Sequence, residues 1–269
     1  MGNILQDKNF KIGHTKDLKI SLAKDLKISL LFTLIGIVAS ICAAMYQMYM
    51  FDEEIQQQIL SQLGSMEALI PIAALQGGII TFLATFIGLK IARKVNLKLN
   101  LVFDKKALIL AIFIGMVTAL IITGSDRFIF AGYLPSKITS YEFSPLYLLT
   151  GVLYGGIIEE ILLRLFVMSL LVLMLWKLFA KSKDYLHIPQ WVYVTAIILA
   201  ALLFAAGHIP FTVQALGASA PILIRGLVLN GIGGIGFGYL YWKKGLAYSM
   251  CAHAATHVFM QVVFMPVFF

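Results

Sequence analysis

The residues best suited to chemistry in this sequence are acidic, basic and imidazole side chains inside strongly apolar stretches. They are Glu159, Glu160, Arg164, His208, Arg225, His253 and His257. Such side chains are costly in apolar surroundings, so they mark either function or buried pairing. A carboxylate can act as a general base, and an imidazole can orient water, donate a hydrogen bond or bind a metal. The pattern therefore predicts proton-transfer or metal chemistry, with structural ion pairing as the alternative.

Glu159 and Glu160 begin a short motif that ends at Arg164. On an α-helix, Glu160 and Arg164 are four residues apart and share a face, so we expect them to pair. Glu159 points about 100° away and has no partner along its own helix. We therefore expect Glu159 to be a free carboxylate that faces another helix and acts as a general base. In the alternative, both carboxylates pair with cations, and Arg225 serves Glu159.

A second motif places Phe204 one helical turn before His208, with Pro210 two residues later. Proline is poorly tolerated inside a helix, so we expect the helix to end just after His208. Phe204 can hold the imidazole in place, and a neutral imidazole can orient a water or shuttle its proton. The alternative is a histidine at the membrane interface that bonds to a backbone carbonyl.

A third motif places His253 and His257 four residues apart, which puts both rings on one helix face. Such a pair can bind a metal or donate two hydrogen bonds to an oxyanion. It is not a zincin motif, because Ala254 stands where that motif needs its catalytic glutamate. The spacing indicates function and leaves both kinds of chemistry open.

The rest of the chain is strongly apolar, since 60% of its 269 residues are hydrophobic and only 13% are charged. Soluble domains average about 25% charged residues, which argues against both a soluble domain and a disordered chain. The formal net charge of +8 could suggest nucleic acid binding. In a membrane protein, however, Lys and Arg gather in cytoplasmic loops. We therefore expect an integral, multi-pass membrane protein with the lipid bilayer, and no nucleic acid, as its partner.

The elements that position the motifs are apolar helices. A span needs about 20 residues, which predicts an all-α, polytopic transmembrane bundle of about seven to eight spans with the active site inside it. The expected spans are 28–50, 68–92, 107–124, 144–180, 190–209, 219–242 and 245–267. The fourth is too long for one straight crossing, so we expect a break or kink near Gly155 and Gly156.

The remaining organisation follows from charge. Residues 1–27 are expected to form a basic, amphipathic segment on the membrane surface, and residues 28–267 a single transmembrane domain. Basic residues precede the first span and fill alternate loops, which predicts a cytoplasmic N-terminus. Counting along straight helices puts Glu159 roughly 27–33 Å from the inner face and His253 roughly 14–20 Å from it.

The three motifs together resemble one family. Glu159-Glu160-x-x-x-Arg164, Phe204-x-x-x-His208 and His253-x-x-x-His257, in this order on separate helices, are similar to the motifs of the CPBP intramembrane glutamic endopeptidases. This is the CAAX protease and bacteriocin-processing family, also called the Abi family. The resemblance covers about residues 145–265, which we take as the catalytic core, and leaves the first three spans unconstrained.

The resemblance implies a glutamate-dependent membrane peptidase that uses no metal or other cofactor. It implies that Glu159 activates a water, that His208 positions this water, and that His253 and His257 bind the oxyanion. The side chains in supporting roles are Glu160, Arg164 and Phe204. His257 stands where the family usually has asparagine, and its imidazole can donate the same hydrogen bond from Nε2 in the right tautomer.

The sequence thus predicts an intramembrane endopeptidase of a bacterial cell membrane. Its substrate is expected to be a membrane-associated peptide or protein, such as a bacteriocin, a signal-peptide precursor or a prenylated CAAX tail. One alternative is a zinc-dependent membrane protease that uses a glutamate with His208, His253 and His257. The other is a non-catalytic membrane immunity protein or transporter that keeps the motifs for helix pairing.

Overall fold

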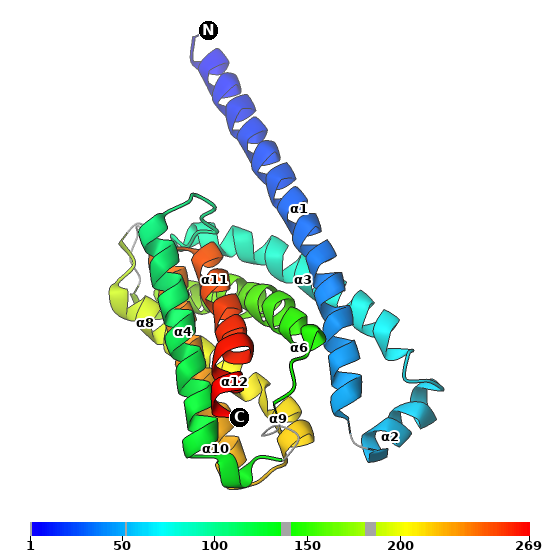
Figure 1. The fold of residues 1–269 in the computed structure, drawn as a ribbon. Helices are drawn as coiled ribbons and strands as arrows, with labels where there is room; N and C mark the ends of the chain where they lie inside the picture. Colours follow the sequence, from blue (N-terminus) through cyan, green and yellow to red (C-terminus); the bar gives the residue numbers. More distant parts are fainter. Residues whose placement is uncertain (1, 52, 136–140, 181–186) are drawn as a thin grey trace.

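The computed structural model describes residues 2–51, 53–135, 141–180 and 187–269, and within these ranges the chain is helical with no strand (Figure 1). The helices are α1 (Gly2–Met50), α2 (Glu53–Leu63), α3 (Leu69–Lys94), α4 (Lys105–Phe128), η1 (Ala131–Tyr133), α6 (Pro145–Thr150), η2 (Gly151–Glu159), η3 (Ile161–Met168), α7 (Ser169–Leu175), η4 (Trp176–Ala180), α8 (Gln190–Gly207), α9 (Ile209–Leu216), α10 (Ala220–Lys243), α11 (Leu246–Val258), η6 (Phe259–Phe264) and α12 (Met265–Phe268).

Seven stretches of the described chain are long and apolar enough to cross a membrane. They are Ser21–Met50, Leu69–Lys94, Lys105–Phe128, Pro145–Ala180, Gln190–Leu216, Ala220–Lys243 and Leu246–Phe268. The prediction of an all-α, multi-pass membrane bundle is therefore confirmed. The connection after the first span contains the helix α2.

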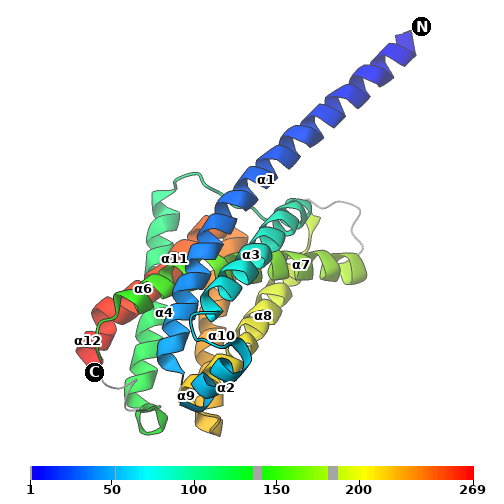
Figure 2. The ribbon, with the colours of Figure 1, turned by 90° about the vertical axis from the view of Figure 1, so that its right-hand side faces the viewer.

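The first span belongs to a single 49-residue helix, α1, that begins at Gly2. Figures 1 and 2 show its N-terminal half projecting from the bundle in line with the span. The basic segment at residues 1–27 on the membrane surface and the domain division after it both stay predictions. Asp25 of α1 is buried and accepts two hydrogen bonds from Arg93 of α3, at 2.7 and 2.5 Å, so these helices are joined near one end of the bundle.

The fourth span runs without interruption from Pro145 to Ala180. The expected break at Gly155 and Gly156 is therefore absent. Instead, η2, η3 and η4 are π-helical, and the wider π turns advance less per residue than an α-helix. Both views show the span strongly inclined to α4 (Figures 1 and 2). Tilt and π-winding together accommodate an apolar stretch that is too long for one straight crossing.

The fourth span also forms the centre of the bundle. Ile161, Leu165 and Met168 of η3 have no exposed surface and belong to the main apolar core. Neighbouring helices approach closely where glycines replace larger residues. A Cβ atom on Gly234 of α10 would lie 2.9 Å from the Cβ of Ala201 in α8. These approaches hold α8, α10 and α11 around the η2–η3 segment.

The start of α11 is fixed by the connection between α3 and α4. Leu246 and Ala247 donate backbone hydrogen bonds of 3.0 Å to the carbonyls of Lys98 and Leu99. The turn before α11 requires Gly245, whose φ of +107° lies in a region that other residues rarely adopt. This connection sets the position of the helix that carries two of the predicted site residues.

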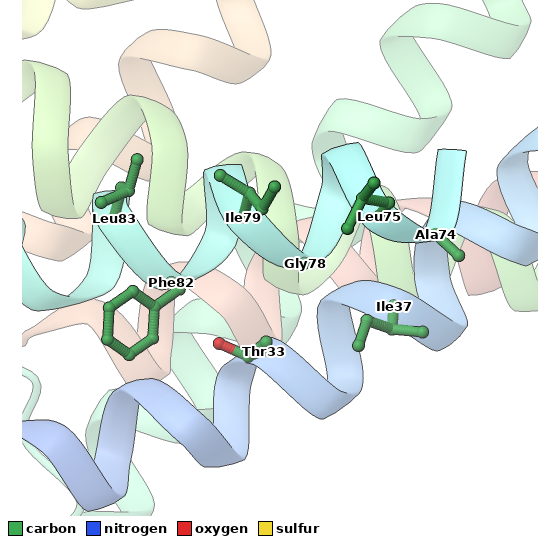
Figure 3. A pocket seen from close by; sticks show the side chains of 8 residues that line it. All are labelled: Thr33, Ile37, Ala74, Leu75, Gly78, Ile79, Phe82 and Leu83. Carbon is green, nitrogen blue, oxygen red and sulfur yellow. The ribbon is translucent and has the colours of Figure 1, made fainter. Parts of the chain in front are cut away.

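A shallow groove separates α1 from α3 (Figure 3). Apolar side chains line almost all of it, and Figure 3 shows Phe82 and Ile37 on opposite helices. Its one hydroxyl, that of Thr33, already donates to the carbonyl of Ser29 at 2.7 Å. The groove therefore offers no polar group for chemistry and lies apart from the predicted site residues.

Candidate active site

Three spans bring the predicted site residues together. Glu159 is the last residue of η2, and Glu160 separates η2 from η3. His208 lies between α8 and α9, and both His253 and His257 lie on α11. π-helical turns in α-helices occur frequently at functional sites. Glu159 and Glu160 lie where two π-helical segments meet.

The Glu159 carboxylate faces imidazole rings from two other spans. Oε1 lies 3.8 Å from His208 Nε2, and Oε2 lies 3.9 Å from His253 Nε2. These distances are too long for direct hydrogen bonds and suit a shared water molecule. The Glu159 side chain keeps 17% of its surface exposed, so water can reach it. As predicted, Glu159 faces other helices and not Arg164.

His208 is held where one helix ends and the next begins. α8 ends at Gly207, as Pro210 predicts, but α9 starts at Ile209 and carries Pro210 in its first turn, where no N–H is needed. His208 Nδ1 lies 2.8 Å from the Phe204 carbonyl oxygen. A carbonyl only accepts, so Nδ1 carries a proton and Nε2 of the neutral ring presents a lone pair towards Glu159.

Glu160 is fully buried, and three side chains contact its carboxylate. Arg164 Nη1 lies 3.0 Å from Oε1, as an ion pair whose N–H is not aligned for a hydrogen bond. His253 Nδ1 lies 2.9 Å from the same oxygen, and the Ser249 hydroxyl contacts Oε2. The predicted pair of Glu160 and Arg164 is present, and Glu160 also holds His253.

Arg164 is a buried cation with several partners. Its Nη2 donates to the Gly234 carbonyl at 3.2 Å. The guanidinium lies over the rings of Phe204 and Phe237, at 4.7 and 5.5 Å from their centroids. Phe204 therefore contacts Arg164 as well as His208, whose ring meets it edge-on at 4.6 Å. One cation thus links the acidic motif to the second motif.

The two imidazoles of α11 are stacked. The His253 ring lies between Phe237, at 4.5 Å, and His257, at 5.3 Å, with interplanar angles of 18° and 19°. Because His253 Nδ1 is bonded to the Glu160 carboxylate, its Nε2 is the nitrogen turned towards Glu159. His257 Nδ1 is buried and has no hydrogen-bond partner.

Glycines of η2 make room for these rings. A Cβ on Gly155 would lie 2.6 Å from His257 Nε2 and 3.4 Å from His253 Nε2. A Cβ on Gly151 would lie 2.5 Å from His257 Nδ1, and one on Gly156 would lie 2.8 Å from the Cβ of Ala254. The glycines that we expected to break the helix therefore serve close packing. They also bring both Nε2 atoms towards one point beside Gly155.

These residues fall within one family match. Residues 141–259 match the family model described as type II CAAX prenyl endopeptidase Rce1-like. The chain carries a CAAX prenyl endopeptidase domain. This family is a protease family, and the match agrees with the resemblance identified from the three motifs. No curated protein and no solved structure matches the chain.

The CAAX prenyl endopeptidase domain contains every site residue predicted from the sequence, whereas the first three spans lie outside it. It includes Arg225, which we considered as a partner for Glu159. The structure instead pairs Arg225 with Asp126 of α4, with hydrogen bonds of 2.5 and 2.6 Å. Asp126 escaped the sequence analysis because we ended the third span at residue 124, whereas α4 continues to Phe128.

Sequence reasoning also missed two side chains that support His253. Ser249 binds Glu160, and Phe237 stacks on the imidazole. A usable signal existed for Ser249, because it precedes His253 by four residues and therefore shares a helix face with both histidines. Phe237 carries no such signal, since an aromatic residue in an apolar span is ordinary.

The site offers no preformed metal centre in the described ranges. No group of three or more His, Cys, Asp and Glu side chains in that part of the chain is arranged to hold a metal ion. His208 Nδ1 and His253 Nδ1 are already bonded to Phe204 and Glu160. Only the Nε2 atoms of these rings remain for a metal or a water.

The Gly155 contacts give a first prediction. Gly155→Ala places a methyl group against His257 Nε2, and such overpacking typically costs about 1–3 kcal/mol. We expect proteolytic activity to fall at least about tenfold, because the His257 ring must move. Gly231→Ala is the matched control, since a Cβ there meets no atom within 4 Å. Activity assays on both variants test this, and equal activities would contradict the proposed packing role.

Proposed function

We propose that this protein is an intramembrane endopeptidase, in which Glu159 activates a water to hydrolyse a peptide bond of a membrane-associated substrate. The main support is the carboxylate of Glu159, which faces two imidazole Nε2 atoms at 3.8 and 3.9 Å in a domain of a protease family. The substrate is a small membrane-associated peptide or protein, such as a bacteriocin, a signal-peptide precursor or a prenylated tail.

In the proposed reaction, a water lies between Glu159 and His208. One water proton is directed to Glu159, and the other is accepted by the lone pair of His208 Nε2. Glu159 takes its proton as the water oxygen attacks the scissile carbonyl carbon. It then gives this proton to the leaving nitrogen as the C–N bond breaks, which yields a new carboxyl end and a new amine end.

His253 and His257 stabilise the oxyanion in this proposal. His253 already donates from Nδ1 to Glu160, so it can donate from Nε2 only when both ring nitrogens carry protons. His257 adds a second donor if its proton sits on Nε2. Donors of this kind are typically worth about 2.7–4 kcal/mol each in the transition state.

The remaining parts of the proposal concern the membrane that holds the protein and its orientation there. Basic residues precede the first span and occupy alternate connections, which favours a cytoplasmic N-terminus. We place the protein in a bacterial cell membrane. The non-catalytic alternative, an immunity protein or transporter, predicts that no peptide is cleaved and that charge-conserving substitutions in the motifs are tolerated.

A peptide library tests the proposal. The full chain in liposomes is mixed with prenylated and unprenylated peptides, with and without a chelator, and the products are read by mass spectrometry. Glu159→Gln is run in parallel, with the exposed Glu142→Gln as its matched control. A product that needs Glu159 and persists with the chelator supports the proposal. A product lost with the chelator supports the zinc alternative, and no product from folded protein supports the non-catalytic one.

A further inference from the structure

Gln261 is a buried amide that the proposed reaction does not use. It lies in η6, and only 1% of its surface is exposed. Among the residues that the structure describes, neither its Oε1 nor its Nε2 atom has a hydrogen-bond partner. Buried polar groups are nearly always bonded, so each exception calls for an explanation. In the described part of the chain, both the amide donor and the amide acceptor of Gln261 lack a hydrogen bond.

The position of Gln261 relates it to the site. It follows His253 and His257 by eight and four residues on a continuous helix, so the three share a face. It therefore lies at most about 6 Å beyond His257 along the helix, because the π turns of η6 advance less per residue than α turns. The Tyr141 hydroxyl donates to its backbone carbonyl at 2.8 Å, which anchors this part of η6.

The facing helix has a second unpartnered group. Thr150 directly precedes Gly151, the residue that packs against His257 Nδ1. The Thr150 hydroxyl oxygen is buried and also has no hydrogen-bond partner within the described ranges of the chain. Each of the two helical segments beside His257 therefore carries a buried polar group without a hydrogen bond among the described residues. These groups are Thr150 of α6 and Gln261 of η6.

We propose that Gln261, with Thr150, binds the backbone of the peptide substrate two or three residues from the cleaved bond; this rests on the proposed peptidase function. A primary amide offers a donor and an acceptor side by side, which complements the C=O and N–H of a peptide backbone. An extended chain advances about 3.3–3.6 Å per residue, so a 6 Å offset corresponds to about two residues. Backbone binding of this kind fixes the register of the scissile bond.

Gln261→Met tests the assignment, because methionine has similar length and no strong hydrogen-bonding group. We expect KM for the cleaved library peptide to rise about tenfold or more with a much smaller change in kcat. The melting temperature is expected not to fall, since an apolar side chain replaces an unpartnered amide. The exposed Gln214→Met is the matched control. An unchanged KM, or a large loss of thermal stability, would overturn the proposal.

A second experiment tests substrate binding by Gln261 separately from catalysis by Glu159. Binding of a farnesylated CAAX-tailed peptide and its unprenylated twin is measured on Glu159→Gln protein, with and without Gln261→Met. Replacing the substrate amides by esters one at a time should reveal a position at which the ester weakens binding only when Gln261 is present. Additive effects would overturn the subsite. If the wild type cleaves nothing, the proposed function fails, and this binding cycle still decides the role of Gln261.

Discussion

Replacing Glu159 by glutamine is expected to lower kcat/KM for peptide hydrolysis by about 10²–10⁴-fold. Glutamine keeps the size of the side chain and can still bond a water, but it cannot take a proton from that water. Folding should be preserved, because Glu159 forms no direct hydrogen bond with the two imidazoles that it faces. These rings lie 3.8 and 3.9 Å from its carboxylate.

The measurement combines initial rates with thermal unfolding of the same preparations. Glu142→Gln makes the same chemical change at an exposed position and should leave both quantities unchanged. Glu160→Gln is the informative comparison, because Glu160 is fully buried and contacts Arg164, His253 and Ser249. We expect it to reduce stability as well as rate. A Glu159→Gln protein with wild-type activity would exclude the proposed general base.

The pairing of side chains within one span was predictable from spacing alone. The four-residue interval correctly paired Glu160 with Arg164 and left Glu159 facing other helices. The same rule, applied one turn earlier on the last span, would have identified Ser249. These predictions succeed because helix periodicity is local, so a sequence interval fixes which side chains share a face.

The relative depth of the spans was not predictable in this way. Straight helices place Glu159 and His253 at different depths, whereas the structure brings their side chains within 3.9 Å. The difference arises from the inclination and π-winding of the fourth span. Both depend on which helices pack against Gly151, Gly155 and Gly156. Pairing between side chains of different spans was also not predictable from sequence intervals, because Arg225 bonds to Asp126 and not to Glu159.

Replacing Arg164 by methionine is expected to be the most destabilising single change in the site. Arg164 is 1% exposed and is the cation beside the fully buried Glu160. Removing one partner of a buried ion pair leaves an uncompensated charge and typically costs about 3–5 kcal/mol. That is a large part of the roughly 5–15 kcal/mol by which a folded protein is stable. The melting temperature and the yield of folded protein in detergent should both fall.

Removing both charges separates stability from function. Arg164→Met combined with Glu160→Gln removes both charges of the buried ion pair, so we expect much of the lost melting temperature to return. Activity should remain low, because the carboxylate that accepts from His253 Nδ1 is then replaced by a neutral amide, which is a weaker acceptor and holds the ring less firmly. The exposed Arg127→Met serves as the control and should change neither quantity. If the double variant regained full activity together with stability, Glu160 and Arg164 would be no more than a structural pair.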